Sequence, residues 1–196
     1  MSSNFPAQVL LVRHGEKLGD PSSDDGISSD LSVRGASRAA AIPSLFCSTQ
    51  TLSCSLSQGS SSFSGQFSSS GTGTAPRFPT PNFIFATQKS HHSNRPVETI
   101  TPLATALNLK INDKHSDDEY GDVANDILQH PKYAGQVVLV CWHHGKLQDL
   151  AQSLGVKNAQ KWPGTVFDRV WQITYPNGVA SLVDAPQMLL YGDSSE

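Results

Sequence analysis

Three short runs of apolar residues stand out along the chain, and each is followed directly by polar side chains. Residues 9–12 are Val-Leu-Leu-Val, residues 82–86 are Asn-Phe-Ile-Phe-Ala, and a third run extends from Gln136 to Trp142. Continuous apolar runs of this length, rich in β-branched and aromatic residues, are typical of strands that are buried on both faces. The pattern predicts three central strands of a largely parallel sheet.

Segments with helical signals lie between these strands. Ser32 is an expected N-cap for a helix over Val33 to Phe46, and Pro43 is expected to kink or end it. Asn94 precedes Arg95-Pro96, and Thr101-Pro102 repeats the same cap-and-proline pattern. Because proline fits the first turn of a helix but not its interior, two short helices are expected here, the second ending at Leu107.

The last third of the chain predicts further helices and a hairpin. An amphipathic helix carries Tyr120, Val123, Ile127 and Leu128, and His130-Pro131 ends it. A helix over Lys146 to Leu154 is expected to stop at Gly155. The runs Phe167 to Thr174 and Val179 to Asp184 flank an Asn-Gly pair, which favours a tight antiparallel hairpin.

Alternating strands and helices predict an α/β, three-layer sandwich, with a mixed, mostly parallel sheet and helices on both faces. The chain has 196 residues, which suits a single domain over residues 1–196. Residues 47–80 are dominated by Ser, Gly, Thr and Gln, so this stretch is expected to be a flexible surface insertion. A lid over a functional site is the alternative for this stretch.

Charge and cysteine usage narrow the function classes. The formal net charge of -3 gives no general attraction to nucleic acid or to an anionic membrane. The first eight residues lack the pattern of a signal peptide, and no apolar run is long enough to span a bilayer, so a cytoplasmic protein is expected. Cys47, Cys54 and Cys141 form no CxxC group, which suits a reducing compartment. The sequence does not indicate an oligomeric state.

Polar side chains at the ends of the three strands suggest a shared site. Arg13 and His14 follow the first strand, Arg95 lies downstream of the second, and His143 follows the third. The carboxyl ends of parallel strands meet at one edge of a sheet, where ligands collect. Guanidinium groups donate paired hydrogen bonds to phosphate oxygens, and a histidine whose other ring nitrogen is held by a carbonyl can attack phosphorus. These residues predict a pocket for a phosphoryl group.

Four motifs together carry a family resemblance. They are Arg13-His14-Gly15-Glu16, Leu31-Ser32-Val33-Arg34-Gly35, Arg95-Pro96-Val97-Glu98-Thr99, and the strand Val137 to Trp142 followed by His143. In these motifs the chain resembles the histidine phosphatase superfamily, also called the phosphoglycerate mutase-like family.

The resemblance implies a metal-independent phosphohydrolase with no cofactor, acting on a small phosphomonoester or diphosphate. It implies a phosphohistidine intermediate on His14, with Arg13, His14, Arg95 and His143 binding the substrate phosphate. A phosphoglycerate mutase-type phosphotransferase is one alternative, since it uses the same intermediate. A catalytically weak phosphate-binding or interaction protein is an alternative of another class.

The chain departs from the family pattern around the second histidine. Trp142 occupies a position usually held by a small residue, and His144 replaces a glycine, so His144 is an alternative to His143 in the pocket. Adjacent histidines do not face one point, which argues against a metal site at either His-His pair.

Three neighbouring acidic residues, Asp117, Asp118 and Glu119, compete for the role of proton donor. Glu119 is preferred because it immediately precedes a helix and has the longer side chain, and Asp118 is its rival. A nearby anion is expected to raise the pKa of the donor.

Other residues near these motifs are interpreted without a role in the chemistry, with one alternative, in which Lys89 or His92 holds a second anionic part of the substrate. The residues expected to be solvated are Glu16, Lys17, Arg34, Arg38, Lys89, His91 and His92. The residues expected to be buried in the core or on the sheet are Cys141, Trp162, Phe167 and Trp171.

Overall fold

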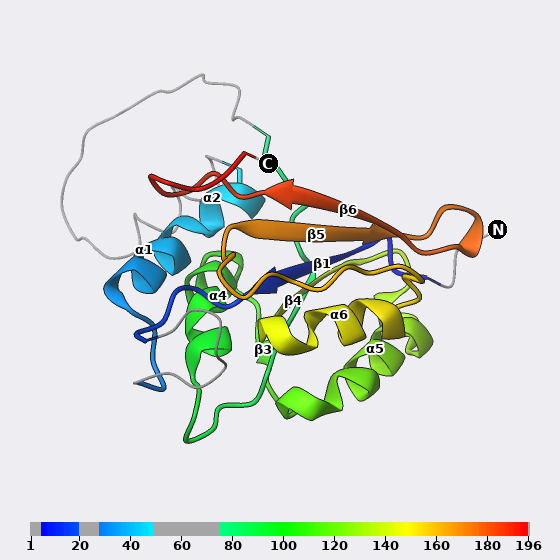
Figure 1. Ribbon diagram of the computed structural model, residues 1–196. Helices are drawn as coiled ribbons and strands as arrows, with labels where there is room; N and C mark the ends of the chain where they lie inside the picture. The colour runs from blue at the N-terminus through cyan, green and yellow to red at the C-terminus, as the bar shows by residue number, and fades with distance from the viewer. Residues whose placement is uncertain (1–4, 20–27, 49–74, 196) are drawn as a thin grey trace.

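The computed structural model describes residues 5–19, 28–48 and 75–195, and the described strands form one six-stranded sheet (Figure 1). The strands are β1 (Gln8–Arg13), β2 (Phe83–Ala86), β3 (Ile111–Asn112), β4 (Val137–Trp142), β5 (Arg169–Thr174) and β6 (Ser181–Pro186). Their order across the sheet is β3-β2-β4-β1-β5-β6. The strands β3, β2, β4 and β1 are parallel, whereas β5 and β6 are antiparallel to their neighbours. The predicted mixed, mostly parallel sheet is therefore confirmed.

Helices cover both faces of this sheet. They are α1 (Val33–Ala41), α2 (Pro43–Phe46), α4 (Arg95–Leu107), α5 (Tyr120–Gln129) and α6 (His144–Ser153), with short 3₁₀ turns η1 (Asp117–Glu119), η2 (Pro131–Tyr133) and η3 (Pro176–Gly178). Figure 1 shows α1, α2 and α4 on one side and α5 and α6 on the other. Within the described ranges, no helix is both long and apolar enough to cross a bilayer.

The two faces of β1 enter two separate hydrophobic cores. Val9 and Leu11 pack in the cluster that includes α5 and α6, whereas Leu10 and Val12 pack in the cluster that includes α2 and α4. Alternate residues of a strand point to opposite faces, so a fully apolar strand needs cover on both sides. This confirms the predicted three-layer sandwich.

The expectation of two short helices after Asn94 is wrong, because α4 is a single helix with Pro102 inside it. An interior proline costs a helix about 3 kcal/mol. The face formed by Val97, Ile100 and Leu103 is buried, and each such side chain contributes roughly 1.5 to 3 kcal/mol on burial. Packing of this continuous face therefore outweighs the local signal of the proline.

Both ends of the Ser- and Gly-rich stretch over 47–80 pack against the core. Cys47 and Phe78 are buried, and the amide of Phe78 donates to the carbonyl of Leu45 at 2.9 Å. The hydroxyl of Thr80 donates to the carbonyl of Phe46 at 2.6 Å. The remainder of that stretch, residues 49–74 with Cys54, lies outside the described residues.

Smaller differences concern element boundaries and Cys141. The last helix begins at His144 rather than Lys146, and the two-residue strand β3 was not predicted. Cys141 is fully buried in β4, as expected, and burial raises the pKa of its thiol. Cys141 is therefore a core residue.

Candidate active site

The parallel strands bring the side chains of separate motifs to one edge of the sheet. Arg13 is the last residue of β1, and the amide of His14 donates to the carbonyl of Trp142 at the end of β4, at 3.2 Å. This pairing places the rings of His14 and His143 with their centroids 5.2 Å apart. Arg95 is the first residue of α4, which follows β2 in the chain.

The geometry of His14 defines its tautomer. Its Nδ1 lies 2.7 Å from the carbonyl oxygen of Gly15, which can only accept, so Nδ1 carries the proton. The other nitrogen, Nε2, is buried and has no hydrogen-bond partner among the described residues. Burial, then the nearby His143 and Arg13, hold the pKa of His14 well below the ordinary histidine value. At neutral pH, Nε2 therefore presents a lone pair.

Both predicted arginines are fully buried and anchored to backbone carbonyls. The Nη1 of Arg13 donates to the carbonyls of Gly164 at 2.5 Å and Val166 at 3.1 Å. The Nη1 of Arg95 donates to the carbonyl of Ser28 at 2.8 Å. The two positive charges both act to lower the pKa of His14. His14 therefore lies in a positively charged environment, which suits an anionic ligand.

Phe167 is buried, as expected, and its ring also contacts residues of the site. Its ring lies under the guanidinium of Arg13, with the carbon Cζ 3.7 Å from the ring centroid. Its ring centroid is also 6.1 Å from that of His14. A buried aromatic face supports a guanidinium that has left water, because the face carries negative charge density. Trp162 and Trp171 are buried, as expected.

His143 is held from both sides, by Asp117, which was a candidate but not the preferred proton donor, and by Ser93, which the sequence did not indicate. Its Nδ1 is 2.9 Å from the Oδ1 of Asp117, and its Nε2 is 3.0 Å from the Oγ of Ser93. The indole of Trp142 donates to the backbone carbonyl of Asp117 at 3.1 Å. The bulky residue that departs from the family pattern thus positions Asp117. His144 is buried at the first turn of α6.

The other two acidic candidates make different contacts. The carboxylate of Glu119 accepts hydrogen bonds from the backbone amide and the hydroxyl of Ser116, at 2.6 and 2.9 Å. These bonds lower the pKa of Glu119 in the free protein. Asp118 is exposed and pairs with Lys146 at 2.7 Å. Of the three acidic residues, Asp117 contacts a histidine of the site.

Thr99 connects the loop that carries His14 to α4. The amide of Gly15 donates to the hydroxyl oxygen of Thr99 at 2.8 Å, and that hydroxyl donates to the carbonyl of Arg95 at 2.7 Å. Thr99 is fully buried. The spacing between the loop of His14 and the helix of Arg95 therefore depends on one side chain.

Gly35 lets α1 approach this loop closely, which yields a mutational prediction. A Cβ at position 35 would overlap the carbonyl oxygen of Glu16 and lie 2.8 Å from its amide nitrogen. These are backbone atoms, so the loop itself would have to shift. We expect Gly35→Ala to lower the urea midpoint, although alanine favours helices. The matched control is Ser37→Ala, an exposed position on α1, and equal values for both variants would contradict the prediction.

Arg38 is buried in an ion network, so the expectation of an exposed arginine is wrong. Its guanidinium bonds to the carboxylates of Glu16 at 2.7 Å and Asp193 at 2.8 Å, and Arg34 adds a bond to Glu16. Glu16 is only partly exposed, and Lys17 is buried, which also corrects the interpretation of both as solvated. Lys89, His91 and His92 are exposed, as expected. The network joins the segment after His14 to the C-terminal segment.

This network predicts a loss of stability in acid. Burial alone would raise the pKa of Asp193, but bonds from Arg38 and from the amides of Leu190 and Leu189 lower it to about 2. Since the unfolded aspartate titrates near about 3.9, its stabilising effect is complete above that pH and is lost as the pH falls towards about 2. Between about pH 5 and about pH 3, the urea midpoint of the wild type should fall more than that of Asp193→Asn. Equal falls would argue against the network.

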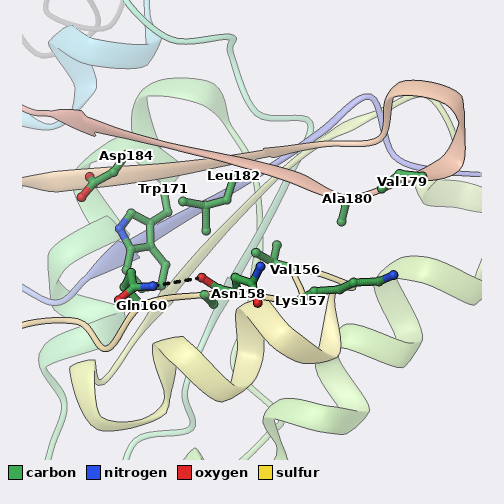
Figure 2. Close-up of a pocket in the computed structure, with 10 residues that line it drawn as sticks. Val156, Lys157, Asn158, Gln160, Trp171, Val179, Ala180, Leu182 and Asp184 are labelled. Atoms are coloured by element: carbon green, nitrogen blue, oxygen red, sulfur yellow. Dashed lines mark hydrogen bonds between the residues drawn. The ribbon is translucent and has the colours of Figure 1, made fainter.

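A separate cavity of about 470 Å³ lies between the segment after α6 and the strands β5 and β6 (Figure 2). Trp171 and Leu182 form an apolar wall of the cavity, and Lys157 and Gln160 line it from the opposite segment. Its one carboxylate, on Asp184, pairs with Arg169 at 2.8 Å. None of the predicted site residues lines this cavity. The candidate active site is therefore the one at the strand ends.

Among the described residues there is no cluster of three or more His, Cys, Asp or Glu side chains that could hold a metal ion. No protein-family model matches the chain, and no curated protein matches it by sequence. Similar proteins are found only by comparing structures, and they define the class of fold.

Three solved structures resemble this one over nearly the whole chain. Phosphoserine phosphatase from Entamoeba histolytica has a TM-score of 0.52 and 11% identity, covering 93% of this chain and 99% of its own. A mycobacterial glucosyl-3-phosphoglycerate phosphatase has a TM-score of 0.51 and 12% identity, covering 90% of this chain and 97% of its own. Phosphoglycerate mutase from Bacillus anthracis has a TM-score of 0.51 and 12% identity, covering 94% of each chain. The chain therefore has the phosphoglycerate mutase-like fold, as the resemblance implied.

Proposed function

We propose that this protein is a phosphohydrolase of the histidine phosphatase type, which hydrolyses a small phosphomonoester through a phosphohistidine on His14. The observation that carries this proposal is the state of the His14 imidazole. It is buried and neutral, its Nδ1 is fixed on a carbonyl, and the lone pair on its Nε2 has no hydrogen-bond partner within the described part of the chain, near two buried arginines. A nucleophile for phosphorus needs this tautomer and this charge environment.

In the first step, Nε2 of His14 attacks phosphorus, and the bond between phosphorus and the ester oxygen breaks. Arg13 and Arg95 stabilise the charge on the phosphoryl oxygens. The ring of His14 keeps its orientation because Nδ1 stays bonded to Gly15. In the second step, water attacks the phosphohistidine and releases inorganic phosphate. The same groups therefore serve both steps.

The leaving alkoxide needs a proton, which we assign to the Asp117–His143 pair rather than to Glu119. The hydrogen bond between Nδ1 of His143 and Oδ1 of Asp117 is 2.9 Å long, and the His143 ring lies next to that of His14. Glu119 instead binds Ser116, which lowers its pKa and makes it a poorer acid near neutral pH. The pair also supplies the base that activates water in the second step.

Turnover of p-nitrophenyl phosphate tests the proposed function. A phosphatase releases inorganic phosphate and p-nitrophenol in equal amounts. A mutase-type phosphotransferase would instead pass the phosphoryl group to an added phosphoglycerate. A phosphate-binding protein without catalytic function would bind phosphate but show no turnover. A panel of phosphorylated metabolites, diphosphates and phosphopeptides would then define the substrate class.

Activity should survive removal of divalent ions, because the arginines and histidines neutralise the phosphoryl charge that a metal would otherwise neutralise. The measurement is the rate after exhaustive EDTA treatment and gel filtration, compared with a mock-treated sample. We expect the two rates to agree within about twofold. A loss that one added divalent ion restores would contradict a metal-independent mechanism.

A further inference from the structure

The contacts of His143 form a chain of three residues that the phosphoryl chemistry does not require in full. Ser93, His143 and Asp117 come from the segment before α4, the end of β4 and the turn η1. The hydroxyl of Ser93 lies 3.0 Å from Nε2, and the carboxylate of Asp117 lies 2.9 Å from Nδ1. Hydroxyl, imidazole and carboxylate in this order and at these distances make up the hydrolytic triad that recurs on unrelated folds.

We propose that Ser93 is a second nucleophile, and that the protein hydrolyses carboxylic esters through an acyl group on Ser93. An ionised carboxylate can only accept, so Asp117 holds the proton of His143 on Nδ1. In the neutral ring, Nε2 is then the acceptor that faces the Ser93 hydroxyl. This is the tautomer in which histidine acts as a general base for serine.

The backbone holds Ser93 in place for this role. The hydroxyl of Ser90 accepts hydrogen bonds from the amides of His92 and Ser93, and the amide of Ser90 donates to the carbonyl of Ser93 at 3.1 Å. Ser93 is buried, so its hydroxyl remains beside His143 rather than in water. A nucleophile on a rigid turn loses little entropy when it reacts.

The surroundings also suit the charge that develops on an ester oxygen. Ser93 lies two residues before Arg95, at the N-terminal end of α4, and the Nη1 of Arg95 bonds to the carbonyl of His92 at 3.3 Å. The positive end of the helix and a guanidinium both favour an oxyanion.

The reaction balances without any other reagent. Ser93 Oγ forms a bond to the carbonyl carbon and gives its proton to Nε2 of His143, and the bond to the alcohol oxygen then breaks. The alcohol leaves with that proton. Water next gives a proton to His143 and attacks the acyl group, which releases the carboxylic acid and restores Ser93.

Ester hydrolysis and covalent labelling test this proposal. The wild type should hydrolyse p-nitrophenyl butyrate, and Ser93→Ala should lower the rate roughly 10³-fold or more. Asp117→Asn should lower it at least about 10²-fold, because the tautomer is no longer fixed. Hydrolysis that survives Ser93→Ala, or its absence in the wild type, would overturn the proposal.

A fluorophosphonate probe identifies the nucleophile directly, because Ser93 displaces fluoride and keeps the phosphonyl group. The probe should be used on the wild type and in the His14→Ala background, where His14 cannot react, and the labelled peptide mapped by mass spectrometry. Label on Ser93 in both proteins is the expected result. Label on the exposed Ser153, or on no serine, would overturn the proposal.

A fold defect in Ser93→Ala would not hide the outcome. Ser93→Cys keeps a nucleophile of similar size and should accumulate a butyryl thioester that intact-mass measurement detects. Absence of both the thioester and the label on Ser93 would overturn the proposal. Phosphatase turnover depends on His14, so loss of the ester reaction alone leaves the proposed phosphatase function standing.

Discussion

His14→Ala should lower phosphate release by roughly 10⁴-fold or more, because no other group in the pocket can replace the attacking nitrogen. The fold should persist, since the side chain makes one hydrogen bond, to Gly15, and its Nε2 makes none among the described residues. Labelled substrate should leave an acid-labile, base-stable phosphoryl adduct on the wild type and none on the variant. Phosphate release by the variant at the wild-type rate would exclude this mechanism.

Two further variants control for indirect effects at His14. In His14→Asn, the side-chain amide can still donate to the Gly15 carbonyl but cannot attack phosphorus. This variant should therefore be as inactive as the alanine variant. His91→Ala removes an exposed histidine near the site and should remain within about twofold of the wild type. Activity in His14→Asn would show that the hydrogen bond, rather than the nucleophile, matters.

Asp117→Asn should lower hydrolysis of an alkyl phosphate by roughly 10²- to 10⁴-fold, because it disables the Asp117–His143 pair that supplies the proton, and losing a general acid usually has an effect of this size. On p-nitrophenyl phosphate the loss should be much smaller, because p-nitrophenolate leaves without a proton. The isosteric control is Glu119→Gln, which removes a carboxylate that bonds to Ser116. It should lower both rates slightly and equally.

The opposite pattern would return the role of proton donor to Glu119. That pattern is a large, alkyl-selective loss for Glu119→Gln with equal, small losses for Asp117→Asn. The pH dependence provides a second measurement: a proton donor must be protonated to act, so the fall in kcat at high pH should disappear from the profile of the variant that lacks the donor. Thermal unfolding of both variants should be compared to confirm that each one is folded.

Local sequence was sufficient to predict the central strands, the final antiparallel pair and most helices, although residues 175–180, with a 3₁₀ turn, join that pair instead of a tight Asn-Gly turn. A run such as Val9 to Val12 can satisfy its backbone and bury every side chain only between two helical layers, so it determines both its own conformation and the architecture around it. The helix α4 is the exception. Pro102 predicted a break, but the buried face of α4 continues past Pro102 and keeps the segment in one helix.

The sequence also determined that Arg13, His14 and His143 lie at one edge of the sheet, because residues that follow parallel strands must end there. Only the tertiary structure decided which side chains face them. Asp117 rather than Glu119 meets His143, Ser93 lies on its other side, and Arg38 is buried against Asp193 from the other end of the chain. These contacts join segments that are distant in sequence, and their geometry depends on side-chain directions that no local pattern specifies.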